Sequence, residues 1–282
     1  MDKIAIVGSG TMGSGIGYVT AAAGYRTSLY DPYLEMLDKA RSYHRQLVDR
    51  ALEKGRLTLE AADGYWGRVA YTDDLAAAVH EAGLIIEAAP EKMDLKKEIF
   101  RQVEALASPA AILGSNTSSL PITELANTVA DPGRVVGVHF FNPAPVMKLV
   151  EIVVGLNTRP ETVEAVVEFV GSVGKESVVV KDLPGFVTTR IGLMLVSEAI
   201  LAHQEGIADK ESLDKAMKLG YNLPMGPLAL ADLIGLDVVL HVLDALFENY
   251  KDPRYRAPIS LRKMVQAGRL GRKTGEGFYT YG

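Results

Sequence analysis

The 282-residue sequence predicts an α/β protein in which a mostly parallel sheet domain is followed by a mainly α-helical domain. Through the first 183 residues, short runs rich in Val and Ile alternate with stretches of helical periodicity, as expected for parallel strands joined by helices. After the KDLPG segment, apolar residues recur only at helical spacing. We therefore expect two domains, 1–183 and 184–282, with the boundary at Pro184.

Eight strands and four long connecting helices are expected in the first domain. The predicted strands are 3–7, 27–31, 68–72, 84–88, 111–115, 135–140, 148–154 and 176–182. The predicted helices lie around 11–23, 33–54, 92–107 and 160–172. In the second domain the helical pattern covers 187–206, 212–220, 227–247 and 259–268. Such strongly apolar helices commonly bury surface against a second subunit, so we expect a homodimer.

The composition restricts the class of protein. No apolar run approaches the roughly 18 residues that a membrane span needs, and 48% hydrophobic with 23% charged residues is ordinary for a soluble protein. The first strand begins at Lys3, which leaves no room for a targeting leader, so we expect a cytoplasmic protein. The absence of cysteine excludes disulfides, a thiolate nucleophile and Cys-ligated zinc. A formal net charge of -5 disfavours nucleic-acid binding.

A glycine motif follows the first predicted strand. IAIVGSGTMGSGIG places Gly8, Gly10 and Gly13 in G-x-G-x-x-G spacing between a strand and a helix. In this Rossmann-like arrangement the first glycine permits a tight turn, the second lets backbone approach a pyrophosphate, and the third lets the helix pack on the strand. Thr11 and Met12 lie in the same loop, at the helix amino-terminus that is expected to face the phosphates.

Asp31 ends the second predicted strand, eighteen residues after Gly13. A carboxylate at this position accepts hydrogen bonds from an adenosine ribose diol and repels the extra phosphate of NADP, so we expect NAD as the cofactor. Arg26 and Arg41 are near enough in the sequence to keep NADP as an alternative. The competing interpretation of the whole pattern is a glycine turn followed by an ordinary strand-ending aspartate.

An imidazole stands near the end of an apolar strand. His139 lies in VVGVHF, at the carboxyl end where ligands bind in open α/β sheets, and the Asn142-Pro143 break follows at once. This position favours chemistry over packing. The other four histidines lie on predicted helices. His44, His80 and His203 are expected on solvated faces, and His241 is expected to be packed.

Glu151 follows twelve residues after His139, in the apolar run KLVEIVV. Burial of an unpaired carboxylate costs several kcal/mol, and an imidazole that gains a proton is a suitable partner. We therefore expect Glu151 to hold one tautomer of His139, which then acts as a general base. The alternative is an edge-strand glutamate that faces solvent.

The SNTSS segment, residues 115–119, follows the predicted strand AILG. Its hydroxyl and amide groups are expected at the same carboxyl edge of the sheet as His139. Such groups orient a ligand oxygen or cap a helix, and capping is the more common use.

Seven motifs together resemble the L-3-hydroxyacyl-CoA dehydrogenase family, and within it the bacterial 3-hydroxybutyryl-CoA dehydrogenases. They are GSGTMG, EAAPEKMDLKKEIF, SNTSSL, HFFNPAPVMKLVE, PGFVTTR, AMKLGYNLPMGPLALADLIGLD and GRKTGEGFY. The likeness covers nearly the whole chain. It implies an NAD-binding domain and a helical domain for dimerisation and substrate. It also implies that (S)-3-hydroxyacyl-CoA, with 3-hydroxybutyryl-CoA as the expected substrate, and 3-oxoacyl-CoA are interconverted by hydride transfer.

The same resemblance implies roles for individual residues. His139 of HFFNP is the catalytic base, and Glu151 is its charge partner. Ser118 and Asn142 hold the 3-oxygen and carbonyl of the substrate, and Glu91 of PEK lies near the nicotinamide. No metal is expected, since imidazole, hydroxyl and amide groups meet the charge that develops on oxygen.

Three further positions concern the substrate. Arg50 and Lys54, spaced i and i+4 on one helix, match the family's basic CoA contacts; without the likeness they are a solvated helix face. Thr189 of PGFVTTR stands where family members commonly carry an active-site asparagine. Its hydroxyl lacks the second donor and the reach of an amide, so this departure bears on turnover and acyl preference more than on the reaction class.

Two other functions stay open from the sequence. One is a dehydrogenase of a free 3-hydroxy acid on the same scaffold, against which Arg50 and Lys54 speak. The other is a non-catalytic dinucleotide-binding or crystallin-like protein, which the presence of both His139 and Glu151 disfavours.

Overall fold

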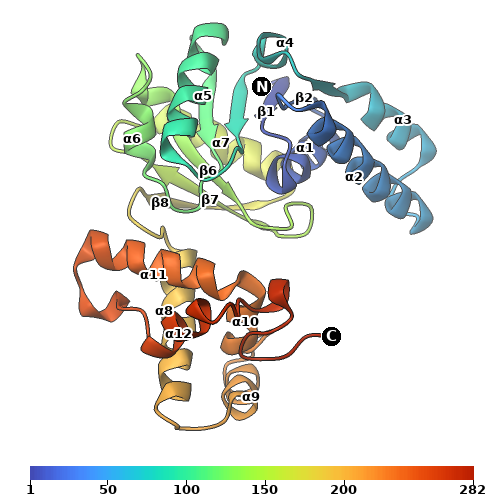
Figure 1. Cartoon of the computed structure of the whole chain (residues 1–282). Coiled ribbons are helices and arrows are strands. Elements are labelled where there is room, and N and C mark those ends of the chain that lie inside the picture. Colours follow the sequence, from blue (N-terminus) through green and yellow to red (C-terminus); the bar gives the residue numbers. More distant parts are fainter. The chain divides into compact units, whose positions relative to one another are not determined.

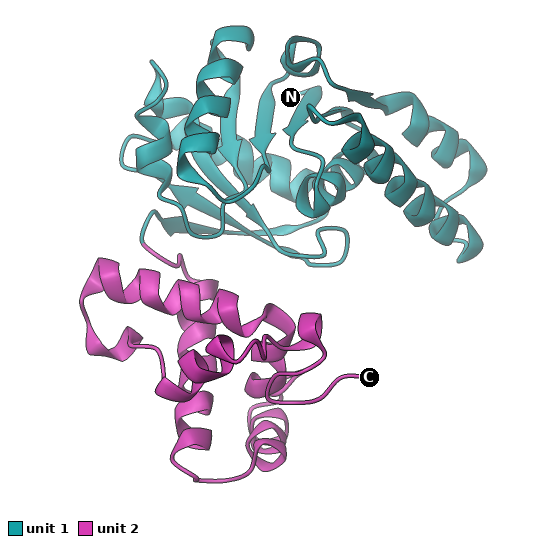
Figure 2. Ribbon diagram, viewed as in Figure 1, with its two compact units in different colours: residues 1–183 teal, residues 184–282 magenta.

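The computed structural model describes all 282 residues and divides the chain into two compact units, Met1–Leu183 and Pro184–Gly282 (Figure 2). The first contains the whole sheet, and the second is built from helices. The predicted fold class, a Rossmann-like and mostly parallel sheet domain followed by a mainly helical one, is confirmed.

Eight strands form one sheet in the order β3-β2-β1-β4-β5-β6-β7-β8. Their bounds are β1 Lys3–Val7, β2 Arg26–Tyr30, β3 Val69–Thr72, β4 Leu84–Glu87, β5 Ile112–Ser115, β6 Val135–Phe140, β7 Leu149–Val154 and β8 Glu176–Lys181. The first six pair in parallel, β7 runs antiparallel to β6, and β8 is parallel to β7. This order reverses direction between β1 and β4, which is the position where ligands bind in doubly wound sheets.

Helices cover both faces of this sheet, which is why its central strands are apolar on both sides (Figure 1). On one face α1 (Thr11–Ala22) and α7 (Pro160–Ser172) share a buried cluster with the strands. On the other face α5 (Met93–Leu106) buries Phe100, which lines a small cavity together with Ile85 and Leu113. Beside α1, α2 (Leu34–Glu53) forms a hairpin with α3 (Leu59–Arg68).

Three helices of this unit were absent from the sequence prediction. α4 (Leu75–Val79) and α6 (Ile122–Ala126) have five residues each, too few to show a helical period. α3 contains two glycines, which lower helix propensity. Its start is fixed by Thr58, whose side chain accepts a hydrogen bond from the Ala61 amide at 3.2 Å.

The carboxyl-terminal unit packs five helices around an apolar core that includes Leu193, Leu228, Leu243 and Leu261. The helices are α8 Thr188–Gln204, α9 Lys210–Gly220, α10 Pro227–Ile234, α11 Leu236–Tyr250 and α12 Ile259–Gln266. Gly235, at a φ of 101°, separates α10 from α11, where the sequence predicted one continuous helical stretch.

Three short 3₁₀ helices complete the chain: Pro132–Arg134, Pro253–Tyr255 and Arg272–Thr274. None of the helices combines the length and the apolar character that a membrane span requires. The cytoplasmic location and the homodimer stay predictions.

Candidate active site

Four neighbouring parallel strands end at one edge of the sheet and bring the predicted site residues there. The glycine loop follows β1, Glu87 ends β4, SNTSS begins at the last residue of β5, and His139 lies at the end of β6. Because β1, β4, β5 and β6 are consecutive in the sheet, these groups lie along one row at its carboxyl edge.

The glycine loop has the shape that a pyrophosphate site requires. Gly8 has a φ of 102°, a left-handed conformation that side chains disfavour. A Cβ on Gly13 would lie 1.7 Å from the Gly8 carbonyl oxygen, so only glycine lets α1 approach β1. A Cβ on Gly10 would meet nothing within 4 Å, which leaves open space over the amino-terminus of α1. Thr11 is exposed and Met12 half-buried in the same first turn.

Asp31 is held against this loop. One carboxylate oxygen accepts hydrogen bonds from the Ser9 amide at 2.8 Å and the Ser9 hydroxyl at 3.1 Å, and the other accepts from the Tyr33 amide at 3.1 Å. A carboxylate has about four lone-pair sites, so one is left to accept from a ribose hydroxyl. Arg26 pairs with Glu81 at 3.6 Å, away from this carboxylate. The residues present therefore fit NAD.

His139 and Glu151 lie opposite each other on the antiparallel strands β6 and β7, so both side chains point to the same face of the sheet. His139 Nδ1 lies 2.9 Å from Glu151 Oε2. Glu151 is fully buried and His139 is 7% exposed. Because β8 covers the outer edge of β7, the alternative of an edge-strand glutamate facing solvent is wrong.

Glu91 gathers the donors of the SNTSS segment. Its Oε1 accepts hydrogen bonds from the Thr117 hydroxyl at 2.6 Å, the Ser118 amide at 2.9 Å and the Ser118 hydroxyl at 3.3 Å. Burial acts to raise the pKa of Glu91, but the Lys96 ammonium and these donors outweigh it and hold the pKa below its usual value. The helix that follows, α6, has Pro121 at its N-cap without a side-chain bond, so SNTSS does not cap it.

Asn142 is exposed and follows β6 by two residues, with a cis bond to Pro143. The end of β6 is tied to SNTSS by a different amide: Asn116 Oδ1 accepts a hydrogen bond from the Phe140 amide at 2.8 Å. His139, Asn142 and the SNTSS segment thus share one corner of the sheet edge.

Comparison with known proteins agrees with this geometry. Residues 3–183 match the family model of the 3-hydroxyacyl-CoA dehydrogenase NAD-binding domain, and residues 185–281 match that of the 3-hydroxyacyl-CoA dehydrogenase carboxyl-terminal domain. The chain belongs to the 3-hydroxyacyl-CoA dehydrogenase family. It is therefore an NAD-dependent dehydrogenase, as the motifs predicted.

Similar members of the 3-hydroxyacyl-CoA dehydrogenase family match along their whole length. The chain is 43% identical to a probable 3-hydroxybutyryl-CoA dehydrogenase of Deinococcus radiodurans, with 99% of this chain and 100% of that protein covered. It is 44% identical to the probable 3-hydroxybutyryl-CoA dehydrogenase of Bacillus subtilis, with 100% of this chain and 98% of that protein covered. The crystal structure of the Ralstonia eutropha (S)-3-hydroxybutyryl-CoA dehydrogenase superposes with a TM-score of 0.98 at 40% identity, covering 100% and 99%.

The three other predicted substrate positions belong to α2 and to the carboxyl-terminal unit. Arg50 is in the last turn of α2, and Lys54 follows as the C-cap residue; both are exposed. Thr189 lies in the first turn of α8, in the carboxyl-terminal unit, and is half-buried.

Two histidine predictions were wrong. His241 is exposed rather than packed. His44, expected on a solvated face, is fully buried. Its Nε2 lies 2.7 Å from the Ser14 carbonyl oxygen, and its Nδ1 lies 2.6 Å and 2.7 Å from the hydroxyls of Tyr65 and Tyr71. Burial lowers the pKa of His44 to about 4, against the opposing effect of the Ser14 carbonyl.

Sequence reasoning also missed a buried ion pair at the sheet edge. Lys96, 1% exposed, lies 2.7 Å from Glu87, which is 2% exposed. The buried positions of α5 are Lys96, Phe100 and Val103, spaced i, i+4 and i+7. That helical spacing was the available signal, because it places the lysine on the core face.

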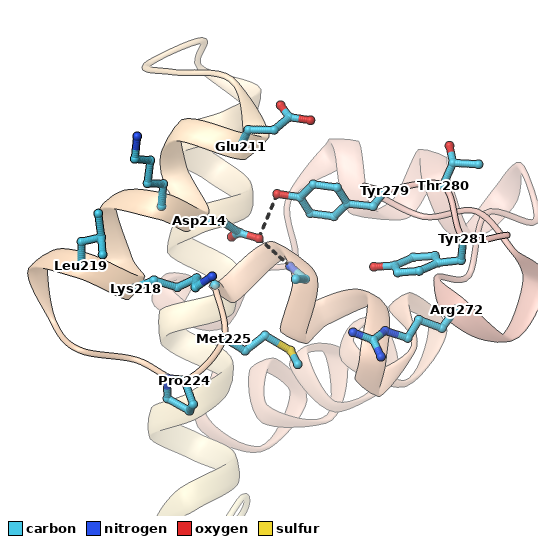
Figure 3. A pocket seen from close by; sticks show the side chains of 13 residues that line it. Glu211, Asp214, Lys218, Leu219, Pro224, Met225, Arg272, Tyr279, Thr280 and Tyr281 are labelled. Atoms are coloured by element: carbon cyan, nitrogen blue, oxygen red, sulfur yellow. Dashed lines mark hydrogen bonds between the residues drawn. The ribbon is translucent and has the colours of Figure 1, made fainter.

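A cavity of about 740 Å³ lies within the carboxyl-terminal unit, lined by α9, the start of α10 and the chain terminus (Figure 3). At its wall, Asp214 accepts hydrogen bonds from the Leu228 amide at 2.8 Å, the Ala229 amide at 3.0 Å and the Tyr279 hydroxyl at 3.0 Å. These bonds satisfy the carboxylate internally. None of the predicted catalytic residues lines this cavity.

Proposed function

We propose that this chain interconverts (S)-3-hydroxybutyryl-CoA and acetoacetyl-CoA with NAD. The observation that carries the proposal is the buried His139–Glu151 pair, 2.9 Å apart, at the sheet edge that also bears the glycine loop. Relatives named for this activity match the whole chain. NAD, when bound, supplies the hydride acceptor.

His139 is the general base in this proposal. Nδ1 faces Glu151, so Nε2 is the ring nitrogen that takes the proton of the substrate's 3-hydroxyl group. The developing imidazolium then lies beside a carboxylate that is shielded from water, which strengthens their attraction. In the reduction direction the same imidazolium returns the proton to the 3-oxygen.

Ser118 and Asn142 are proposed to hold the 3-oxygen and the thioester carbonyl. The Ser118 hydroxyl donates its one proton toward Glu91 at 3.3 Å, and we propose that it turns this proton to the substrate oxygen on binding, while the Ser118 amide keeps its bond to Glu91. Glu91 is proposed to lie beside the nicotinamide. Its lowered pKa keeps it ionised, and therefore an acceptor, through the neutral range.

The remaining assignments concern the rest of the substrate. Arg50 and Lys54 are proposed to bind the CoA phosphates, because they are exposed cations at the end of one helix. Thr189 is proposed to act in acyl binding, with a hydroxyl in place of an amide. We further propose that the carboxyl-terminal unit forms a homodimer.

The test is NADH oxidation monitored by absorbance, with acetoacetyl-CoA, free acetoacetate and longer 3-oxoacyl-CoA esters, each repeated with NADPH. We expect kcat/KM to be at least about 10²-fold higher for acetoacetyl-CoA than for acetoacetate, because CoA binding energy is lost with the free acid. Equal rates would identify a free-acid dehydrogenase. NADH binding without turnover of any substrate would identify a non-catalytic protein.

An Arg50→Ala/Lys54→Ala double variant sharpens this test. We expect a higher KM for acetoacetyl-CoA, by roughly tenfold, with kcat nearly unchanged, since removed phosphate contacts act equally on ground and transition states. An Arg45→Ala variant, which removes an exposed cation earlier on the same helix, is the matched control. An unchanged KM in the double variant would move the CoA site elsewhere.

A further inference from the structure

Two buried charges lie at the sheet edge: Glu87, which has no role in the mechanism above, and Lys96, whose only role there is to keep Glu91 ionised. Glu87 ends β4, and Lys96 lies one turn into α5. The Lys96 ammonium donates to Glu87 Oε1 at 2.7 Å and to the Ala89 carbonyl oxygen at 3.2 Å, and it lies 3.4 Å from Glu91 Oε2. Its three N–H groups therefore have three acceptors.

Glu87 also holds the strand beside it. Its Oε2 accepts a hydrogen bond from the Ser115 hydroxyl at 2.6 Å, and its Oε1 accepts one from the Ala89 amide at 2.6 Å. Ser115 is the last residue of β5 and the first of SNTSS. The carboxylate is thus bonded to β5 and to the loop that carries Glu91.

The two carboxylates hold opposite ends of one short segment. Glu87 bonds Ser115 at its start, and Glu91 bonds Thr117 and Ser118 at its end. Lys96 lies between the two acids. We call Glu87, Glu91 and Lys96, together with the segment 115–118 that the two acids hold, the two-acid clamp.

We propose that Glu87 is a positioning residue that sets the Ser118 hydroxyl for the substrate through this clamp. The inference rests on the proposed contact between Ser118 and substrate. Lys96 is closer to Glu87 than to Glu91, by 2.7 Å against 3.4 Å, so Glu91 keeps its Oε1 turned to the SNTSS donors. Without charge on Glu87, Lys96 draws Glu91 toward itself and away from Ser118.

Stability alone does not account for this arrangement. A buried ion pair is often no more stabilising than apolar residues of the same volume, because both charges lose their hydration. Here Phe100 and Val103 already give α5 an apolar contact with the sheet. A charge pair at this place instead fixes the orientation of the Glu87 carboxylate, since each of its oxygens accepts from a defined donor.

The test is a double-mutant cycle between Glu87→Gln and Ser118→Ala, measured as kcat/KM for acetoacetyl-CoA at saturating NADH. Glutamine keeps the size of the side chain and removes its charge. We expect Glu87→Gln to lower kcat/KM by roughly tenfold in the wild-type background and by less than about twofold in the Ser118→Ala background. The matched control is Glu124→Gln on α6, which removes an exposed 2.6 Å ion pair with Lys97, the neighbour of Lys96 on α5.

The outcomes are distinct. Equal losses in both backgrounds, or a Glu87→Gln enzyme as active as Glu124→Gln, would overturn the inference while leaving the proposed function intact. A Ser118→Ala enzyme with unchanged kcat/KM would overturn the proposed role of Ser118 and this inference with it. If Glu87→Gln does not fold, Ser115→Ala removes the 2.6 Å donor to Glu87 and takes its place in the same cycle, with a smaller expected loss of about threefold.

Discussion

Two buried imidazoles in the amino-terminal unit have opposite surroundings. His139, at the end of β6, faces the carboxylate of Glu151. His44, on α2, is enclosed by a backbone carbonyl and the hydroxyls of Tyr65 and Tyr71. Both rings are shielded from water, so burial does not separate a catalytic histidine from a structural one.

The partners of each ring decide which protonation state it favours. Because a carbonyl oxygen only accepts, His44 must donate from Nε2 to Ser14, which leaves Nδ1 to accept from the tyrosines. That arrangement suits a neutral ring and matches a pKa of about 4. A carboxylate partner such as Glu151 instead stabilises a ring that gains a proton, as a general base must.

Substitution of His139 should have the largest effect. We expect His139→Gln to lower kcat by about 10²- to 10⁴-fold, the usual contribution of a general base, while the Kd for NADH stays within about twofold. Stopped-flow or steady-state NADH oxidation and NADH fluorescence titration measure the two quantities. His80→Gln, which alters an exposed histidine of the same unit, is the control. Unchanged turnover in His139→Gln would remove this ring from the mechanism.

Removal of the Glu151 charge should have a smaller effect in the same direction. We expect Glu151→Gln to lower kcat by roughly 10- to 10²-fold, since the imidazolium formed in the reaction loses its buried anionic partner. A kcat equal to that of wild type would assign Glu151 to structure alone.

The comparison also shows what a sequence can predict. His139 was identifiable because it lies near the carboxyl end of a strand, β6, that the sequence marks as buried. Glu151 lies on the same face of the sheet because it pairs directly with His139 across the two strands. The fold followed from the same alternation of strand and helix patterns.

His44 stands at helical spacing from the apolar Leu37, Ala40 and Val48, which was a local signal of burial, but its hydrogen-bond partners come from α3 and β3 and could not be identified. α3 was itself not predicted. The burial of Lys96 had a local signal in its helical spacing with Phe100 and Val103, but its pairing with Glu87 had none, because only the packing of the two elements brings these residues together. Contacts between elements distant in sequence leave no local pattern.

The pKa of His44 predicts an acid-sensitive component of stability. The folded value of about 4 lies below the ordinary 6.5, so the unfolded chain binds the proton more readily between these values. The stabilisation is present above about pH 6.5 and is lost as the pH falls toward 4. Between pH 7 and pH 5 we expect a loss of about 2 kcal/mol that is missing in His44→Gln.

Urea titration followed by Trp66 fluorescence measures this difference. Trp66 is the only tryptophan of the chain, and its ring lies 5.0 Å from that of Tyr65, so it reports on the His44 surroundings directly. His80→Gln should keep the full acid loss, because its imidazole is exposed. Equal losses in wild type and His44→Gln would contradict the lowered pKa.

The smallest expected effect is on the free energy of unfolding, when either of the two tyrosines that share His44 Nδ1 is replaced. A neutral Nδ1 has one lone pair, so one hydroxyl donates to it and the other can donate to the first hydroxyl oxygen. Burial raises the pKa of Tyr71 to about 12 and raises that of Tyr65 further, so both stay protonated donors at neutral pH.

Tyr65→Phe and Tyr71→Phe should therefore each cost about 1 kcal/mol or less at pH 7, because the remaining hydroxyl takes over the bond to Nδ1. The double variant leaves a buried acceptor without a donor and should cost more than the sum of the two, by about 1 kcal/mol. The same urea titration measures all three. Additive costs would mean that the hydroxyls do not substitute for each other, and that only one of them holds the ring in its neutral form.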